Sequence, residues 1–444
     1  MEYPGSKFTR RIRLATLLLF ITAFFLISPL VLIYSAGYRF DFRNGLLLET
    51  GSLSVDILPK SSTVYLDGLN LDQTMPIRLN NITPHKYTLK ISAPGYYDWE
   101  KQIEINKNKT TYIKEFSLLK KNKPKLISND NAAALALSFS GRYLAYTVTK
   151  NNRTELTIED ERQQIPTHTF QLSGTLNLNW APLADFLAVS SDAGGGKRVS
   201  VINAETGKIN GIYSVDPILK YVWGNTSDLN LYFGTRKGIY SFAPELGASN
   251  LITPTKFLDW YMTDGTLWTL DVSTSTGELG IWKDSLGFKS LFNSFAAIGD
   301  SQTSTLANLE FVTIRHGTTL LKDQAGNRFY IIRSNDKFVV NANKYLFSKI
   351  NNWWIFWNRY ELWTYSEGDE PYLLNRSGEK PENVLSLDQF NTLALLRAGK
   401  ISALFPYFYL DRTMIDDGVK VMTNNPNGRI LYFSDNKGIW KLDY

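Results

Sequence analysis

The sequence predicts an all-β fold behind one N-terminal transmembrane helix, and three observations support this fold class. Aromatic residues make up 14% of the 444 residues, and aromatic side chains favour strands because they pack well on a pleated, half-buried surface. Short runs of alternating apolar residues recur between turns rich in Gly, Pro, Asn and Asp, which is the pattern of half-buried strands. One apolar run of helical length lies near the N-terminus. At about 100 to 200 residues per domain, the length predicts two or three domains.

The chain contains no cysteine. This excludes disulfides, thiol nucleophiles and thiolate metal sites, and it favours a bacterial source, because a eukaryotic secreted protein of this size usually carries bridges. The formal net charge is +6, of which four basic residues and one acidic residue in the first 13 supply +3, which leaves +3 for the rest. This balance predicts no nucleic-acid partner, because a nucleic-acid-binding domain concentrates positive charge on one face.

Residues 14–36 are predicted to form a transmembrane helix and to contact the lipid bilayer. The run LATLLLFITAFFLISPLVLIY at 14–34 has about 21 uncharged residues, enough at 1.5 Å per residue to cross roughly 30 Å of hydrocarbon. The basic segment KFTRRIR precedes it and the mixed-charge RFDFR follows. The positive-inside rule therefore predicts that residues 1–13 are cytoplasmic and that the rest of the chain is extracytoplasmic. A cleaved signal peptide is the alternative, although Tyr34-Ser35-Ala36 is a poor cleavage site.

Residues 50–118 are predicted to form a small β-sandwich. Apolar residues alternate in four places, at 53–57, 64–66, 87–91 and 103–105, and a period of two indicates strands buried on one face. Turn signals such as Asp67-Gly68 and Pro94-Gly95 separate the strands by about 8 to 15 residues, as a sandwich requires.

The order of strands and turns in this segment resembles the PEGA domain family. The resemblance rests on Gly51 to Val55, Pro59, Val64-Tyr65-Leu66-Asp67-Gly68, Thr74, Pro76, Pro84-His85-Lys86-Tyr87 and Ala93-Pro94-Gly95-Tyr96. The sequence departs from the family at Pro59-Lys60-Ser61-Ser62, where the tetrapeptide that names the family is expected, and at His85, where a glycine is expected. The resemblance implies a binding or spacing module of envelope proteins in bacteria and archaea, without catalytic residues.

Residues 119–124 are predicted to be a linker, and residues 125–444 a β-propeller. A turn followed by two apolar strands recurs at roughly 40 residues in this part of the chain. The clearest turns with their second strands are SFSGRYLAY at 138–146, WAPLADFLAV at 180–189, WGNTSDLNLYF at 223–233 and NPNGRILYF at 425–433. These units resemble the blades of TolB-like and WD-repeat propellers, and third strands are predicted within 197–208, 237–242 and 437–444.

The propeller is predicted to have seven or eight blades, since roughly 320 residues divided by 40 gives eight and the middle repeats have diverged. Less regular second strands are predicted near residues 267–270, 309–314, 345–349 and 392–396. The inner strand at 437–444 leaves its blade one strand short. We predict that residues 124–128 pair with it and close the ring, which removes two exposed sheet edges.

No motif in the sequence predicts catalysis, a metal site or a cofactor. Gly194-Gly195-Gly196-Lys197 lacks the first glycine and the Ser or Thr of a phosphate-binding loop and is predicted to be a hairpin turn. The acid pairs Asp369-Glu370 and Asp416-Asp417 are of the type that glycoside hydrolysis uses, but adjacent acids in turns are usually just solvated. The histidines lack the spacing of metal ligands. They are His85, His168 and His316.

The densest aromatic run is WWIFWNRYELWTY at 353–365. It is predicted to form a hairpin with residues 358–361 at its tip, whose alternating aromatics pack on both sides between neighbouring blades. The alternative is a ligand platform, because Trp and Tyr stack on sugars and dominate protein-binding hot spots. The candidate platform residues are Trp353, Trp354, Trp357, Tyr360 and Trp363.

Together these features predict a membrane-anchored, extracytoplasmic protein of a bacterial cell envelope that binds or scaffolds other molecules and is not an enzyme. Its expected partner is an envelope protein or a cell-wall glycan. Two alternatives stay open. One is a dedicated cell-wall glycan-binding protein, and the other is an envelope hydrolase whose site lies in the propeller channel, which would need acids and histidine converging at the channel mouth.

Overall fold

The computed structural model describes residues 10–35, 38–41, 46–151, 153–163, 165–224, 229–255, 257–272, 279–285, 287–295, 309–323, 327–333 and 336–444. The chain divides into two compact units, Met1–Lys121 and Asn122–Tyr444. Residues 1–9 of the predicted cytoplasmic segment, residue 36 of the predicted transmembrane helix, and residues 225–228 of the third predicted blade turn lie outside the described residues.

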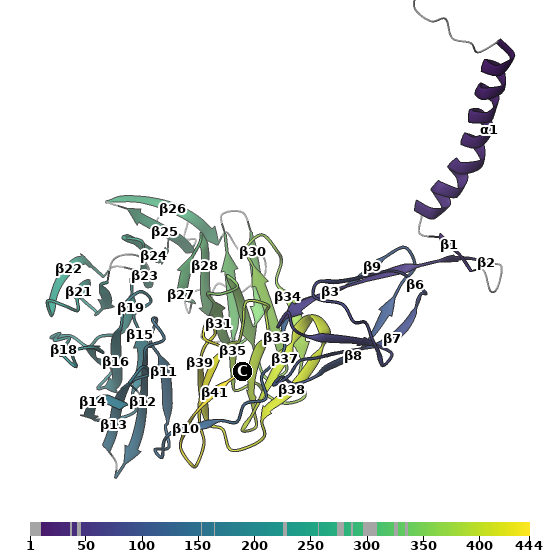
Figure 1. The fold of residues 1–444 in the computed structure, drawn as a ribbon. Coiled ribbons are helices and arrows are strands. Elements are labelled where there is room, and N and C mark those ends of the chain that lie inside the picture. The colour runs from purple at the N-terminus through teal and green to yellow at the C-terminus, as the bar shows by residue number, and fades with distance from the viewer. Residues whose placement is uncertain are drawn as a thin grey trace, which may run out of the picture. The chain divides into compact units, whose positions relative to one another are not determined.

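The first unit begins with one long apolar helix, α1 (Arg10–Ser35), drawn in purple in Figure 1. Its most apolar window has a mean hydropathy of 2.6, and none of that window is buried in the protein. A helix satisfies its own backbone hydrogen bonds and can therefore cross hydrocarbon. By length and composition α1 fits a membrane span, and a signal sequence near an N-terminus has the same features. A two-stranded ribbon of β1 (Tyr38–Asp41) and β2 (Leu46–Glu49) follows.

Residues 51–117 form two small sheets, which contact each other where the rings of Trp99 and Phe116 lie 5.0 Å apart. The first sheet has the order β6-β3-β9, with β3 and β9 parallel, and the second has the order β5-β4-β7-β8. The alternation predicted in β3 is confirmed, because Leu53, Val55 and Ile57 are buried. The strands are β3 (Gly51–Leu58), β4 (Thr63–Leu66), β5 (Leu69–Asn70), β6 (Ile77–Ile82), β7 (His85–Ser92), β8 (Trp99–Ile105) and β9 (Thr110–Ser117).

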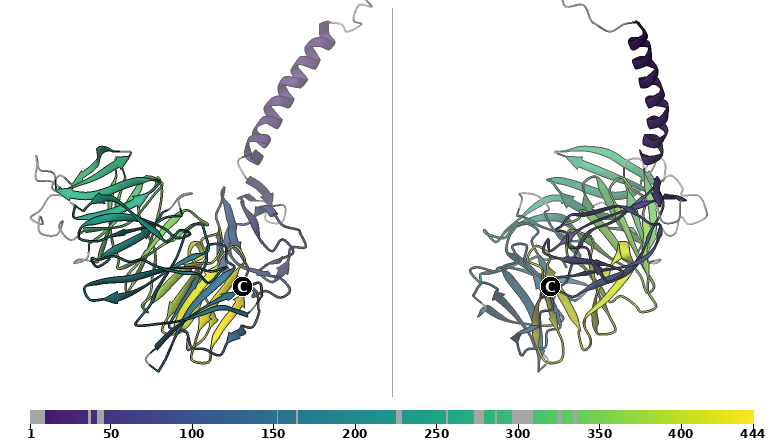
Figure 2. Two further views of the ribbon diagram at one scale, coloured as in Figure 1. Left: turned by 90° about the vertical axis from the view of Figure 1, so that its left-hand side faces the viewer. Right: turned by 45° about the vertical axis from the view of Figure 1, so that its right-hand side comes forward.

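The second unit consists, in its described residues, of eight four-stranded antiparallel sheets, which are the blades of a propeller (Figures 1 and 2). This confirms the higher of the two predicted numbers. Blade 1 comprises β11 (Ala134–Leu137), β12 (Tyr143–Lys150), β13 (Arg153–Asp160) and β14 (Ile165–Leu172), and blade 2 comprises β15 (Asn177–Trp180), β16 (Phe186–Ala193), β17 (Gly196–Asn203) and β18 (Ile209–Gly211). Blade 3 comprises β19 (Lys220–Trp223), β20 (Leu231–Gly234), β21 (Gly238–Ala243) and β22 (Ala248–Pro254), and blade 4 comprises β23 (Asp259–Thr263), β24 (Thr266–Val272), β25 (Leu279–Ser285) and β26 (Phe288–Phe295).

Blades 5 to 8 follow the same plan. Blade 5 comprises β27 (Leu309–Arg315), β28 (Thr318–Asp323), β29 (Arg328–Ile332) and β30 (Lys337–Asn341), and blade 6 comprises β31 (Lys344–Ser348), β32 (Trp353–Trp357), β33 (Glu361–Ser366) and β34 (Tyr372–Arg376). Blade 7 comprises β35 (Asn383–Ser386), β36 (Leu393–Arg397), β37 (Lys400–Phe405) and β38 (Leu410–Ile415). Blade 8 comprises β39 (Val421–Asn425), β40 (Ile430–Ser434), β41 (Ile439–Asp443) and, from the other end of the repeat region, β10 (Lys125–Ser128). A short 3-10 helix, η2 (Pro406–Phe408), precedes β38.

Two of the four less regular second strands predicted from the sequence are first strands in the structure. Residues 267–270 and 392–396 do fall in second strands, β24 and β36. Residues 309–314 and 345–349, however, belong to β27 and β31, which are the first strands of blades 5 and 6. Both kinds of strand lie inside the propeller and are apolar, so alternation in the sequence does not distinguish them.

The ring closes through strands from the two ends of the repeat region, as predicted. β10 pairs antiparallel with β41, and Lys125 lies opposite Lys441 and Leu126 opposite Trp440. β41 therefore lies between β10 and β40 in blade 8. Ile439 and Tyr432 of blade 8 pack with Leu144 of blade 1 in one apolar cluster, so the closed blade also contributes to the core.

Candidate ligand-binding site at the channel mouth

The first strand of each blade faces the centre of the propeller. Neighbouring first strands lie beside each other, as β11 does with β15 and β39, and β23 with β19 and β27. Towards the ends of the first strands of blades 1 to 6, residues of these strands and of the turns after them surround a cavity of about 520 Å³. We call this cavity the channel mouth. Its size falls in the ordinary range of small-molecule pockets, about 300 to 1,000 Å³.

Two tryptophans at the channel mouth each make an equivalent hydrogen bond to the preceding blade. Trp180 ends β15 and its Nε1 donates to the Ala136 carbonyl oxygen at 3.1 Å, while Trp223 ends β19 and its Nε1 donates to the Asn179 carbonyl oxygen at 3.0 Å. Each bond reaches 44 residues back along the chain, which is about one repeat. Each indole thus ties its blade to the preceding one and holds an aromatic ring at the cavity wall.

Two cations also line the channel mouth, Arg315 at the end of β27 and Lys349 just after β31. The Arg315 guanidinium lies over the Phe347 ring, 4.8 Å from its centroid. Lys349 Nζ lies 5.0 Å from the centroid of the Phe139 ring and 3.5 Å from the Pro182 carbonyl oxygen. Since Phe139 and Pro182 belong to turns of blades 1 and 2, the Lys349 side chain reaches across the channel.

Titratable side chains at the channel mouth are partly exposed to solvent, yet the surrounding protein shifts their pKa values. Tyr345 on β31 exposes 38% of its surface, yet burial raises the pKa of its hydroxyl to about 12. Water reaches a group on such a wall, while the surrounding protein disfavours its charged form. Burial lowers the pKa of Lys349 for the same reason, and repulsion by the positive charge of Arg315 lowers this pKa further.

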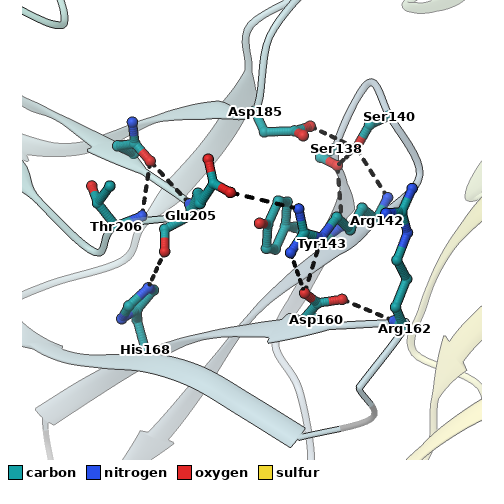
Figure 3. A network of polar contacts seen from close by, with 11 residues as sticks. Ser138, Ser140, Arg142, Tyr143, Asp160, Arg162, His168, Asp185, Glu205 and Thr206 are labelled. Atoms are coloured by element: carbon teal, nitrogen blue, oxygen red, sulfur yellow. Dashed lines mark hydrogen bonds and ion pairs between the residues drawn. The ribbon is translucent and has the colours of Figure 1, made fainter.

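A polar network holds the turn that carries Phe139 (Figure 3). Ser138 Oγ accepts a hydrogen bond from the Tyr143 backbone N–H at 3.1 Å, which closes the turn. Ser140 Oγ donates to Asp185 Oδ1 in the neighbouring blade at 2.8 Å. The turn of blade 1 is thereby fixed to the corresponding turn of blade 2, and both turns supply residues to the channel mouth.

Arg142 and Asp160 anchor the other side of this turn. Asp160 Oδ2 accepts from Arg142 Nε at 2.9 Å and from Arg142 Nη2 at 2.8 Å, a two-point ion pair (Figure 3). Burial alone would raise the pKa of Asp160, but the Arg142 guanidinium and the Arg162 backbone N–H lower it below its ordinary value. The carboxylate therefore stays ionised and paired, which suits a structural role.

The candidate platform residues separate into two groups. Trp353, Trp354 and Trp357 on β32 are each 4% exposed. Trp354 packs in the apolar cluster shared with blade 5, and Trp353 and Trp357 pack in the cluster shared with blade 7. This is the two-sided packing that the alternation predicts, so these three rings are part of the core and present no accessible face to a ligand.

The other two candidates lie at the far end of the hairpin. Tyr360 is exposed in the turn between β32 and β33, with the Arg359 guanidinium 5.3 Å from its ring centroid. Trp363 on β33 is half-buried, and its Nε1 donates to Glu361 Oε2 at 3.1 Å. A ligand platform stays a prediction for this pair.

The glycine run, the acid pairs and His168 lie in turns or make contacts close to their own strands. Gly194 and Gly195 have φ of 53° and 86° and form the hairpin between β16 and β17, as predicted. The acid pairs at 369–370 and 416–417 are exposed. His168 Nε2 lies 3.3 Å from the Glu205 carbonyl oxygen (Figure 3), and its ring occupies the space that a side chain at Gly207 would need. Among the described residues, no group of three or more His, Asp or Glu side chains could hold a metal ion.

Sequence reasoning missed the channel mouth, although the signal was present. Arg315 and Lys349 each come directly after the apolar stretch that forms a first strand. A prediction that puts residues 309–314 and 345–349 in second strands does not place these cations on the channel. Recognising Trp180 and Trp223 as equivalent residues that end first strands would have set the register for the later blades.

Residues 50–118 match the family model described as the PEGA domain. No curated protein matches the chain by sequence. Among solved structures, the β-propeller domain of Cps50 (Swd1) from Myceliophteria thermophila is similar, with 10% identity and a TM-score of 0.46 over 71% of this chain and 97% of that one.

Two further propellers are similar at the same level. The Dos1 propeller has 13% identity and a TM-score of 0.47 over 72% of this chain and 94% of that one. The propeller domain of the Trilobed protease from Pyrococcus furiosus has 10% identity and a TM-score of 0.42 over 67% of this chain and 98% of that one. The chain contains a PEGA domain at residues 50–118 and, in its second unit, a β-propeller whose eight sheets have four strands each.

Proposed function

We propose that this chain is a non-enzymatic binding or scaffolding protein, anchored in the cytoplasmic membrane of a bacterium by α1, with its PEGA domain and propeller on the outer side. The length and hydropathy of α1 support the anchor. The basic residues at and before its start support an orientation with the N-terminus in the cytoplasm. A PEGA domain supports a place in the cell envelope.

The channel mouth is the observation that carries the proposed binding role. It is a concave site with aromatic rings and two cations, and none of its lining residues is Asp, Glu, His or Cys. A hydrolytic site needs a nucleophile or a pair of acids with a base, whereas rings and a few polar groups suffice to hold a ligand. We propose that the partner is an envelope protein and that the site binds it without turnover.

Site-specific photo-crosslinking in the source bacterium tests this proposal. The photoreactive residue p-benzoylphenylalanine is placed at Phe139, which is 53% exposed at the channel mouth, or at Phe288, which is 81% exposed on the outer strand β26. We expect irradiation to yield a discrete protein adduct from position 139 and none of the same size from position 288. Both variants replace a Phe, so the comparison isolates the place of contact.

Three results would contradict the proposal. The same adducts from both positions would show contact without a defined site. Release of soluble sugar from wall glycan by the purified chain, lost when Asp369 and Glu370 are changed to amides, would establish a hydrolase. An adduct with glycan in place of protein would favour the cell-wall glycan-binding alternative.

A further inference from the structure

We propose that the channel mouth binds an organic oxyanion, with Arg315 and Lys349 holding the negatively charged group and the neighbouring rings contacting the body of the molecule. The ligand class is a carboxylate or phosphate attached to a flat or sugar-like body. This inference rests on the proposed binding function and specifies the anionic group through which the partner enters the site.

The first step is the missing countercharge. Among the described residues, some partly buried cations of the propeller have acidic partners, as Lys220 has with Asp259 at 2.7 Å and Lys441 has with Glu161 at 2.8 Å, whereas Lys283 and Lys322 lie over aromatic rings without an ion pair. Arg315 and Lys349 have no ion pair with any described residue, and no acid lines their cavity. Two like charges in a narrow site of reduced dielectric are costly unless an anion neutralises them.

The second step is the donor geometry. The Arg315 guanidinium lies over the Phe347 ring, 4.8 Å from its centroid, and makes no hydrogen bond to a described residue. Because they have no described hydrogen-bond partner, its N–H groups can bind a planar carboxylate or a phosphate at two points. Lys349 Nζ contacts the Pro182 carbonyl at 3.5 Å, a long distance, which leaves its donors for a ligand.

The third step is the surroundings of the cations. Phe139 and Phe347 lie directly under the two charges, and Tyr345 lies on the same wall. Aromatic faces stack on flat groups and on the apolar faces of sugars. A cavity of about 520 Å³ has room for such a body beside its anionic group. Phe139 is 53% and Tyr345 is 38% exposed, so an organic anion can cover aromatic surface that an inorganic anion would leave in contact with water.

The test uses the full chain in non-ionic detergent and a pair of isosteric probes. Benzoate and benzamide have the same shape, but only benzoate is charged near neutral pH. We expect ligand-observed saturation-transfer NMR titrations to show benzoate binding at least about tenfold more tightly than benzamide, with the difference shrinking as NaCl screens the cations. Phenyl phosphate is the third probe. Tighter binding of phenyl phosphate than of benzoate indicates a phosphate ligand, and the reverse order indicates a carboxylate.

The variants Arg315→Gln and Lys349→Gln should each reduce benzoate binding to the level of benzamide. Lys289→Gln is the matched control, because Lys289 Nζ also lies over an aromatic ring, 4.9 Å from the Trp282 centroid, on an outer strand. It should keep the preference for benzoate. Equal binding of benzoate and benzamide by the unmodified chain would overturn the proposal without any need for a variant to fold. A preference lost equally in Lys289→Gln would overturn it too.

Failure here is distinguishable from failure of the proposed function. If the chain shows no preference for benzoate but photo-crosslinking from position 139 still yields its discrete adduct, the binding role stands and the oxyanion assignment is wrong. If the preference for benzoate is present and the adduct is missing, the site binds an anion but the protein partner is wrong.

Discussion

At the scale of single residues, the most consequential side chain outside the channel mouth is a carboxyl at the closure of the ring. Glu159 on β13 is 4% exposed, and burial, with the nearby Glu161 charge, raises its pKa to about 7 against the attraction of Lys441. Tyr146 and Tyr432 are the other titratable groups that interact with it. The neighbouring Glu161 has two partners of its own, because its Oε2 accepts hydrogen bonds from Tyr432 Oη and Lys441 Nζ, both at 2.8 Å.

This carboxyl predicts a pH dependence of stability with a definite sign. The unfolded chain ionises Glu159 near 4.5 and the folded chain near 7, so between these values the folded state binds the extra proton and stability falls as pH rises. We expect Glu159→Gln to raise the free energy of unfolding by roughly 1 to 3 kcal/mol at pH 8 and to have no effect below the ordinary pKa. Urea unfolding across this pH range measures it, with the exposed Glu245→Gln as control. An equal effect of Glu159→Gln at both ends of the range would rule out the linkage.

At the same scale, the burial of some residues could be predicted from the sequence, whereas the roles of others could not. The two-sided burial of Trp353, Trp354 and Trp357 follows from their alternation, because every second side chain of a strand faces the same neighbour. The roles of Arg315 and Lys349 could not be predicted. Their meaning depends on which strand of a blade they follow, and on residues more than 100 positions away that complete the cavity.

At the scale of elements, blade 8 depends on β41, which residues 439–443 form. β41 lies between β10 and β40, and Ile439, Leu442 and Tyr444 are buried. Gly438 faces the backbone carbonyl of Ser128 on β10, and a side chain at this position would collide with that carbonyl. The pairing could be predicted because a ring has no free edges when its first and last strands meet. The sandwich strands β6 and β9 were not predicted, because their burial alternates poorly.

Removal of residues 438–444 should therefore destabilise the whole propeller. The loss of three buried side chains costs about 1.5 to 3 kcal/mol each, which together is comparable to the stability of a typical domain, about 5 to 15 kcal/mol. We expect the truncated chain to aggregate or to melt far below the full chain in a circular-dichroism experiment. Gly438→Ala should lower the melting temperature in the same direction by a smaller amount. A truncated chain that melts within a few degrees of the full one would disprove closure by β10 and β41.

At the scale of the whole molecule, the proposed topology rests on few residues. α1 is apolar along its length, and the charges at its two ends decide which side each unit occupies. Four basic residues precede or begin the helix, and the positive-inside rule keeps such a segment in the cytoplasm. The propeller and PEGA domain would then share the outer compartment with the proposed partner.

The absence of cysteine from the sequence makes this topology directly measurable, because any introduced cysteine is unique. Leu69→Cys and Leu246→Cys place thiols on exposed positions of the PEGA domain and the propeller, and Ser6→Cys places one in the basic N-terminal segment. We expect a membrane-impermeant maleimide to label the first two in intact spheroplasts and Ser6→Cys only after permeabilisation. Because the label at position 6 marks a chain of full length in the membrane fraction, it also separates an anchor from a cleaved signal peptide. Labelling in the reverse order would place both folded units in the cytoplasm and remove the basis for an envelope partner.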